Sequence, residues 1–284
     1  MHGPQGDEKL QQMLRLRAGM KRIKHKVVVL SGKGGVGKST VAVNLAVGLV
    51  QRGFKAGLLD TDIHGPNVAH MLGLDAAVMT IRDTEIEPLE ARPGLFVVSL
   101  ALAGRPVDTA YIWRGPIKIA LVNQLLADTA WPELDFLIVD SPPGTGDEPM
   151  TVCELLNPSP SRGSVIVTTP QAVSVLDARR TVDFSRRIKM PVLGMVENMS
   201  GYLTPDGTVL PLFGEGGGAA AAGELNIPFL GAVAMDPRAV VTSEQGLALL
   251  EAETGLKTAF DRVIDGVLNG LAQLSPASAA PQEE

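Results

Sequence analysis

A glycine-rich stretch at residues 32–40, which reads GKGGVGKST, constrains the fold more than any other part of this chain. An apolar run at residues 27–30 precedes the stretch, and a helical pattern over residues 40–51 follows it. The order of strand, glycine-rich loop and helix, together with the pattern G-x-x-x-x-G-K-[ST], predicts a phosphate-binding loop. A glycine-rich turn that binds nothing is the alternative.

The residues of this loop suit phosphate for separate physical reasons. Glycine has no Cβ and adopts positive φ readily, so successive backbone N–H groups can turn toward phosphate oxygens. The helix that follows adds the positive end of its dipole. Lys38 would reach the β- and γ-phosphates of ATP, and the Ser39 hydroxyl would join the shell of a Mg²⁺ ion. The expected nucleotide contacts in the loop are Gly32, Gly34, Gly35, Val36, Gly37, Lys38, Ser39 and Thr40.

Beyond the loop, the chain alternates apolar runs with helical patterns. The apolar runs lie at residues 27–31, 56–60, 95–100, 136–140, 164–169, 192–196 and 229–233. This alternation predicts an α/β fold with a mostly parallel sheet. Hydrophobic residues make up 45% of the chain and aromatic ones only 4%, which favours an aliphatic core with helices on both faces of the sheet. We expect an N-terminal extension with a docking helix at 1–25, one ATPase domain at 26–274 and a disordered tail at 275–284.

The overall charge narrows the class of partner. A net charge of −6 argues against a nonspecific nucleic-acid binder. The N-terminal extension carries a basic cluster, for which a solvated helix face is the simpler interpretation. No apolar run approaches the roughly 20 residues that span a bilayer, and no signal-peptide pattern is found. We therefore expect a cytoplasmic protein with neither a membrane nor a nucleic acid as partner.

Three aspartates follow predicted strands, at the edge where open α/β sheets bind ligands. Asp60 and Asp62 stand two residues apart at a strand end, so their side chains point the same way. Asp140 closes a buried apolar strand, where a carboxylate needs a partner and a water-bridged Mg²⁺ supplies one. The glycine-containing loop after Asp140 suits a switch that senses ATP hydrolysis. Two plainer interpretations stay open: Asp60 caps a turn, and the loop is a rigid structural turn.

A second lysine narrows the motif further. Lys33 stands immediately before Gly34 and Gly35, which resembles the deviant Walker A (SIMIBI) class of P-loop ATPases that includes MinD and ParA. Within that class, a series of segments resembles the Mrp/ApbC/Nbp family of iron–sulfur cluster carriers. The segments, in order, are IKHKVVVLSGKGGVGKST, LLDTDIHGPNVAHMLG, IWRGP at residues 112–116, LDFLIVDSPPGTGDEP, ENMSG, FGEGGG and AVAMDPR. The resemblance covers roughly residues 20–250.

The resemblance implies catalytic roles. Lys33 would cross a dimer interface and neutralise charge at the partner's nucleotide, as an arginine finger does, although a solvated lysine is the alternative. Asp62 would orient or deprotonate the attacking water. Asp60 and Asp140 would hold Mg²⁺ through water, beside Ser39. The implied activity is ATP hydrolysis to ADP and phosphate by a homodimer, slow in isolation, in the setting of iron–sulfur cluster assembly or transfer to apoproteins.

The resemblance also implies contacts with the adenine base. Asn198, Asp236 and Pro237 stand at the matching positions. Because its amide offers both a donor and an acceptor, Asn198 can pair with one edge of adenine. A strand-end cap is the alternative role for Asn198.

One departure from the family is large. Members that carry a cluster have a C-x-x-C pair between the ENMS and FGEGGG segments, and two subunits share a cluster through it. Here residues 201–212 contain no cysteine and no histidine, and the TPDG sequence at 204–207 predicts a hairpin turn. Cys153 is the only cysteine, whereas a cluster normally needs four thiolates. We expect Cys153 to be a small buried apolar residue and the cofactors to be ATP and Mg²⁺, without a cluster of the chain's own.

Other functions stay open beside the dimeric ATPase. One is a regulatory ATPase that acts with a cysteine-bearing partner. Another is a positioning switch like MinD or ParA that binds a membrane or a DNA-bound partner. A basic amphipathic helix near the C-terminus would favour membrane binding, but residues 255–274 carry mixed charge. A nucleotide-dependent binding module without turnover is disfavoured by the presence of Asp62.

Overall fold

One strand, β1 (Ile23–Leu30), lies inside the sheet and pairs in parallel with a neighbour on each side. Its residues 27–30 have no exposed surface, as expected for a strand covered on both faces. The computed structural model describes residues 4–63, 65–83, 85–104, 115–159, 161–252 and 254–274. Within these residues β1 belongs to a sheet of nine strands.

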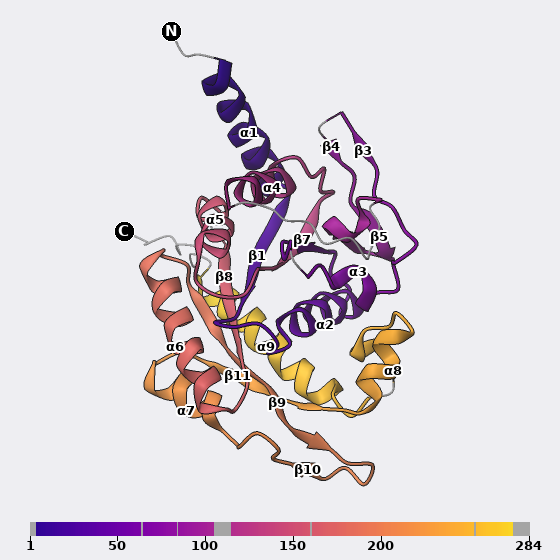
Figure 1. The fold of residues 1–284 in the computed structure, drawn as a ribbon, viewed down its shortest axis with the longest axis vertical. Coiled ribbons are helices and arrows are strands. Elements are labelled where there is room, and N and C mark those ends of the chain that lie inside the picture. Colours follow the sequence, from indigo (N-terminus) through magenta and orange to yellow (C-terminus); the bar gives the residue numbers. More distant parts are fainter. Residues whose placement is uncertain are drawn as a thin grey trace, which may run out of the picture.

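The other strands of this sheet flank β1 and run mostly parallel to it. They are β2 (Ala56–Asp60), β5 (Leu89–Arg92), β6 (Leu95–Val98), β7 (Leu134–Asp140), β8 (Arg162–Thr168), β9 (Val192–Leu203), β10 (Val209–Leu210) and β11 (Phe229–Met235). The order is β10-β9-β8-β1-β7-β2-β6-β5, and β11 pairs with β9 (Figure 1). Only the outer pairs β5–β6 and β9–β10 are antiparallel. A separate hairpin joins β3 (Ile81–Arg82) to β4 (Glu85–Ile86).

Helices cover both faces of the sheet. They are α1 (Pro4–Lys21), α2 (Lys38–Gln51), α3 (Val68–Met71), α4 (Gly115–Ala127), α5 (Asp147–Leu156), α6 (Ala172–Arg187), α7 (Gly217–Glu224), α8 (Arg238–Glu244) and α9 (Lys257–Leu274), with short 3₁₀ turns at Leu100–Leu102 and Leu249–Glu251. α2 packs against α9, whereas α4 packs against α5 and α6 against α7.

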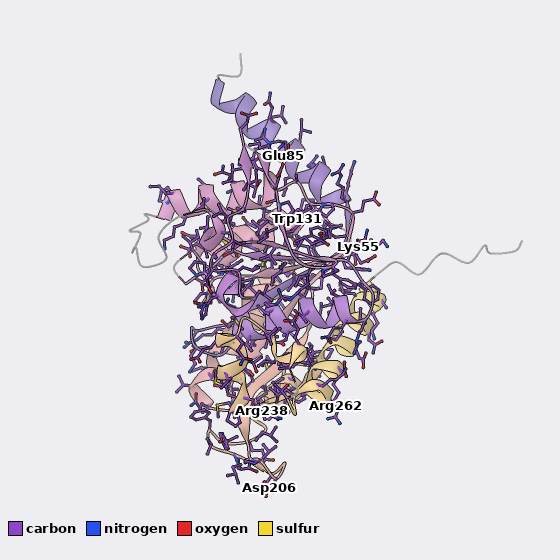
Figure 2. The ribbon with its side chains drawn as sticks, turned by 90° about the vertical axis from the view of Figure 1, so that its right-hand side faces the viewer. Lys55, Glu85, Trp131, Asp206, Arg238 and Arg262 are labelled. Carbon is purple, nitrogen blue, oxygen red and sulfur yellow. The ribbon has the colours of Figure 1, made fainter. Side chains whose placement is uncertain are left out.

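Two parts of the molecule, α1 and the turn between β9 and β10, project beyond the core at opposite ends (Figure 1, Figure 2). α1 contacts α4 and projects beyond it (Figure 1). Leu16 and Met20 anchor the second half of α1 in the core, while Leu10, Met13 and Leu14 are exposed. Asp206, in the turn between β9 and β10, lies at the opposite end (Figure 2). Both projections expose apolar side chains away from the main core.

The predicted fold class is confirmed, and each of the seven expected strand runs overlaps an observed strand. The ends differ where packing extends the pairing: β1 begins at Ile23, which pairs with Leu134, so the strand starts inside the expected N-terminal extension. The hairpin turn at residues 204–207 is also confirmed, since the Thr204 amide donates to the Thr208 carbonyl at 2.8 Å. β5 was not anticipated. The predicted tail at 275–284 and residues 112–114 of the IWRGP segment lie outside the described residues.

Candidate functional site

The glycine-rich loop follows β1 and leads directly into α2, which begins at Lys38. Gly35 and Gly37 have φ values of 79° and 80°, which favour glycine. A Cβ on Gly34 or Gly35 would meet no atom within 4 Å, so the space over the loop is open. A Cβ on Gly37 would instead lie 2.0 Å from Asn198 Nδ2. The loop is therefore open where phosphate would bind and closely packed where it meets Asn198.

Lys38 and Asp140 form a buried ion pair at this edge of the sheet. Lys38 Nζ lies 2.5 Å from Asp140 Oδ1, and the two side chains are 6% and 0% exposed. The pairing register aligns Asp140, the last residue of β7, with Val29 of β1 and Asp60 of β2. Three segments far apart in the sequence thus bring the predicted phosphate-binding lysine to two of the predicted metal ligands.

The carboxyl group of Asp140 is incompletely satisfied. Its Oδ2 atom is buried and has no hydrogen-bond partner. Burial raises the pKa of Asp140, while the charge of Lys38 and a hydrogen bond from Ser39 act in the opposite direction. An unpaired buried carboxylate oxygen next to a serine hydroxyl is a donor set that fits a hydrated Mg²⁺ ion.

Asp60 and Asp62 have different surroundings although they are two residues apart. Asp60 is 1% exposed, and its pKa is raised by burial and by the negative charge of Asp140. Its Oδ1 accepts from the Asp62 amide at 3.0 Å, and its Oδ2 accepts from Ser99 Oγ at 3.1 Å. Asp60 therefore caps the turn, the plainer role considered for it, and also faces Asp140. Asp62 is only half-buried, and its Oδ1 lies 3.3 Å from the Gly65 amide.

The loop after Asp140 is joined to the phosphate-binding loop by backbone hydrogen bonds. The Gly144 amide donates to the Ser31 carbonyl at 2.8 Å, and Gly144 has a φ of 95°. The hydroxyl of Ser141 is buried without a partner, close in sequence to the open oxygen of Asp140. The Ser31 hydroxyl donates to the carbonyl of Lys33, whose side chain is half-buried. A change at one loop can therefore pass to the other.

The predicted adenine contacts are not all equally open to a base. Asn198 Nδ2 donates to the Val36 carbonyl at 2.8 Å, so the side chain holds the phosphate-binding loop. The Asp236 carboxylate accepts from Arg238 and, at 3.1 Å, from the Gly255 amide. The hydrogen bonds from Arg238 lower the pKa of Asp236. Pro237 is exposed and stands at the N-terminus of α8.

Three residues with supporting roles were missed from the sequence. Ser99 and Ser141 lie in the buried acidic site; Ser99 is the one polar residue of the predicted run at 95–100, and Ser141 directly follows Asp140. Glu197 Oε2 accepts from the Gly218 amide at 2.6 Å and so caps the start of α7. This contact joins the ENMSG segment to the FGEGGG segment.

Cys153 is buried in α5, away from solvent. Burial raises the pKa of its thiol to about 12. In the parts of the chain that the structure describes, no three histidine, cysteine or acidic side chains gather into a metal site. Across the same residues, no helix has the length and apolar character needed to cross a membrane.

The sequence of this chain is similar to those of several known proteins. The family described as "ParA: NUBPL iron-transfer P-loop NTPase" matches residues 22–268. An iron–sulfur cluster carrier protein of Methanococcus maripaludis is 43% identical over 259 residues, which cover 91% of this chain and 89% of that protein. The human cytosolic Fe-S cluster assembly factor NUBP2 is 44% identical over 227 residues, covering 79% of this chain and 84% of its own.

Solved structures agree at the level of the fold. A nucleotide-binding protein from Archaeoglobus fulgidus, solved with ADP, has a TM-score of 0.71 and 33% identity, covering 82% of this chain and 91% of its own. MinD from Pyrococcus furiosus has a TM-score of 0.60 at 22% identity, covering 86% of this chain and 98% of its own, and shares the fold alone. On the matched length and the identity together, this chain belongs to the family of NUBPL-type iron-transfer P-loop NTPases.

Proposed function

We propose that the protein is a Mg²⁺-dependent ATPase that works as a homodimeric switch in iron–sulfur cluster assembly or transfer. The observation that carries this proposal is the buried Lys38–Asp140 pair, whose open carboxylate oxygen lies at the edge of the sheet that also carries the phosphate-binding loop. Burying a charged pair costs desolvation energy, and the cost is higher where one of its oxygens has no hydrogen-bond partner. A ligand that binds Asp140 Oδ2 would offset that cost, which supports a binding role for the pair. Phosphate and Mg²⁺ would satisfy both of its members.

The residues of the site have complementary tasks in hydrolysis. The loop amides and Lys38 would hold the β- and γ-phosphates. Mg²⁺, held by Ser39 and through water by Asp140 and Asp60, would neutralise phosphate charge. Asp62 would accept a hydrogen bond from the attacking water, whose oxygen bonds to the γ-phosphorus as the bond to the β–γ bridging oxygen breaks. The proton of that water would pass to Asp62 or to the released phosphate.

Lys33 would complete the site from the other subunit. This role is supported by the half-buried side chain of Lys33 and by its place in the chain immediately before the open glycines Gly34 and Gly35. A cation delivered by the partner would stabilise charge in the transition state. Hydrolysis would then depend on dimerisation and be slow in a monomer. We propose that Asn198, Asp236 and Pro237 contact the adenine base. Asn198 would then exchange its hydrogen bond to the Val36 carbonyl for one to the base.

Its relatives supply the cellular setting that we propose. They are named as iron–sulfur cluster carriers and as a cytosolic assembly factor. The sequence offers one cysteine, and that thiol is buried and weakly acidic. We therefore infer that the cluster is cargo held by cysteines of a partner or client protein, in the cytoplasm, while this chain supplies the ATP-driven switch.

Mixing two inactive variants tests the proposed switch. Lys33→Ala and Asp62→Ala should each reduce ATP hydrolysis by about 100-fold, since each removes a group that acts in the transition state. In a mixed dimer, one site keeps its own Asp62 and receives Lys33 from the other subunit. Random mixing should therefore restore about a quarter of wild-type turnover, because half of the dimers are mixed and each has one complete site.

The alternatives give different results in the same experiment. No recovery, with mixed dimers shown by differently tagged subunits, would mean that Lys33 acts within its own subunit or not at all. Absence of ATP hydrolysis by the wild-type dimer with Mg²⁺ would refute the ATPase itself. Binding of a fluorescent ATP analogue by both variants is the control that keeps loss of binding separate from loss of chemistry.

A further inference from the structure

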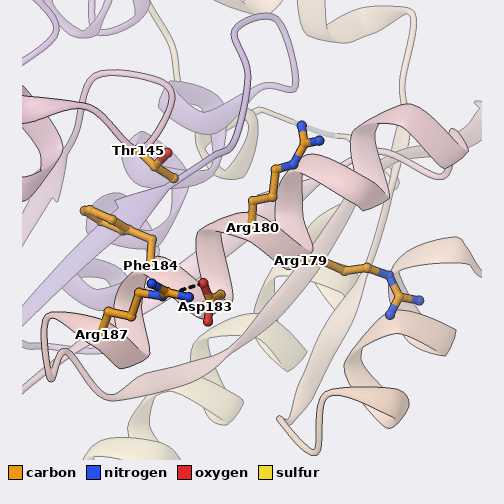
Figure 3. Close-up of a pocket in the computed structure, with 6 residues that line it drawn as sticks. All are labelled: Thr145, Arg179, Arg180, Asp183, Phe184 and Arg187. Carbon is orange, nitrogen blue, oxygen red and sulfur yellow. Dashed lines mark hydrogen bonds and ion pairs between the residues drawn. The ribbon is translucent and has the colours of Figure 1, made fainter.

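A basic groove runs along α6 beside the loop that follows Asp140. Its cavity volume is about 530 Å³, and it is lined by Thr145, Phe184 and four charged residues of α6, namely Arg179, Arg180, Asp183 and Arg187. In Figure 3, Arg180 and Phe184 extend from α6 on the side of Thr145, while Arg179 reaches the other way. None of these residues has a role in the proposed ATPase site.

Two of the three arginines of this groove make only exposed ion pairs. Arg180 and Arg187 have side chains that are 68% and 78% exposed, and each pairs with an aspartate on its own helix. Such exposed pairs contribute little to stability and exchange partners easily. Arg179 is more tightly held, by Glu224 of α7 at 2.6 Å. A basic residue at position 187 also suits the C-terminal end of the helix dipole, but Arg180 lies in the middle of α6, where the dipole gives no reason for it.

The same helix exposes apolar side chains close to the groove. Leu176 and Val173 are 49% and 67% exposed and lie one and two turns before Arg180. Residues three, four and seven positions apart share a face of a helix, so Val173, Leu176 and Arg180 form one continuous strip. An exposed strip that combines two aliphatic residues with arginines is complementary to a helix with leucines and carboxylates.

One wall of the groove is connected to the nucleotide site. Thr145 stands next to Gly144, whose amide donates to the Ser31 carbonyl at 2.8 Å. Ser31 precedes the phosphate-binding loop, and Asp140 lies five residues before Thr145. Movement of this loop on nucleotide binding would displace a wall of the groove, while α6 itself need not move.

We propose that this groove binds an acidic amphipathic helix of a partner protein, and that the nucleotide state of the ATPase alters its affinity. A protein segment fits better than a nucleic acid, because Asp183 lies inside the groove, aliphatic residues extend it and the net charge of the chain is −6. Glutamates of the partner would pair with Arg180 and Arg187, and its leucines would cover Phe184 and Leu176. The dependence on nucleotide rests on the proposed switch function, whereas the binding itself does not.

A designed peptide provides the probe. It is a fluorescein-labelled helical 16-mer with glutamates at i, i+3 and i+7 and two leucines beside them, and its control has glutamine at every glutamate. Fluorescence anisotropy of the full-length protein should show salt-dependent binding of the glutamate peptide alone. Arg180→Glu should weaken that binding by about tenfold, since it places like charges opposite each other. The matched control, Arg262→Glu on α9, reverses an exposed arginine outside the groove and should leave binding unchanged.

Each result separates the parts of the proposal. A non-hydrolysable ATP analogue with Mg²⁺ should change the affinity for the peptide at least about threefold relative to ADP, which is a modest coupling between sites. Equal binding of both peptides, or equal effects of the two arginine variants, would overturn the groove as an acidic-helix site. Tighter binding of a single-stranded RNA than of the peptide would overturn the choice of partner. Unchanged affinity in a protein that binds the ATP analogue normally would remove the nucleotide link only, and failure to bind ATP would refute the proposed switch instead.

Discussion

The carboxyl edge of the sheet and the hairpin that ends β9 contrast sharply within one molecule. At the edge, Lys38, Asp60 and Asp140 are buried and directed toward one another. In the hairpin, Val209, Leu210 and Leu212 are 48%, 44% and 57% exposed, and no thiol or imidazole is present in residues 201–212. The edge keeps charged groups that cost energy to bury, whereas the hairpin exposes apolar groups that cost energy to leave in water.

Under the proposed function, this difference separates a nucleotide site from a cluster site. Nucleotide chemistry depends on backbone geometry and on side chains contributed by several strands, and the side chains that we propose for it meet at one edge of the sheet. Metal binding depends on a few ligands in one loop, and an ordinary two-residue β-bridge between β9 and β10 occupies that place. Under the proposed function, the switch is kept in a chain whose residues 201–212 offer no cysteine or histidine.

The largest expected effect comes from breaking the buried pair at the carboxyl edge. Lys38→Ala should abolish ATP hydrolysis and lower the free energy of unfolding by about 3 kcal/mol, because it leaves the Asp140 carboxylate buried without its counter-ion. Urea denaturation and a phosphate-release assay measure the two effects. Adding Asp140→Asn to Lys38→Ala should recover most of the stability but no activity. Equal stability of the single and double variants would mean that the pair is not truly desolvated.

The hairpin provides a second test, in which we expect no difference between the wild type and the variant. Anaerobic incubation of the wild-type protein with iron and sulfide should give no stoichiometric cluster by absorbance or iron content, and Cys153→Ser should behave identically. The matched positive control is Pro205→Cys with Thr208→Cys, which places two thiols at C-x-x-C spacing on exposed positions of the turn in each subunit. A stoichiometric cluster in the wild type that disappears in Cys153→Ser would contradict our view of both the hairpin and Cys153.

The same contrast explains how far the sequence predicts the structure. The fold and the loop around Lys38 are predictable because strand runs, glycine spacing and the lysine are all local patterns. The open oxygen of Asp140 is not, because it depends on where β7 lies relative to Lys38 and Ser39. For the same reason, the contact of Asn198 with Val36 and the capping of α7 by Glu197 could not be predicted, since each joins segments far apart in the chain.

A smaller effect, on the affinity for ATP, is expected where Gly37 of the phosphate-binding loop packs against Asn198. Gly37→Ala would place a Cβ 2.0 Å from Asn198 Nδ2 and hold a non-glycine residue at a φ of 80°. Affinity for ATP should fall about tenfold, in line with strain of one to a few kcal/mol at such a position. Gly53→Ala is the matched control, because it holds a non-glycine residue at a φ of 88° outside the site and its new Cβ meets no atom within 4 Å. Removing the clash with Asn198→Ala should recover part of the loss in Gly37→Ala, and a failure to do so would assign the effect to backbone strain alone. Equilibrium titration with a fluorescent ATP analogue gives all four values.

The smallest effect concerns a second buried lysine, at the other end of β1. Lys26 is 2% exposed and donates to the Ile23 carbonyl at 2.5 Å, with no carboxylate partner among the contacts described. Burial lowers its pKa to about 8, so between pH 8 and 10.5 the unfolded chain holds a proton that the folded chain has lost, and stability rises with pH. Lys26→Met removes the cost of burying a charge at pH 7 but also removes one hydrogen bond, so the net gain should be about 1 kcal/mol. That gain should shrink toward zero or below by pH 10, as the wild-type lysine becomes neutral.

Urea denaturation of both proteins at pH 7 and pH 10 measures the difference in the free energy of unfolding. A variant that is less stable by the same amount at both pH values would show that Lys26 stays charged inside the core. Confirmation would distinguish Lys26, which has no carboxylate partner among the contacts described, from Lys38, which is paired with Asp140.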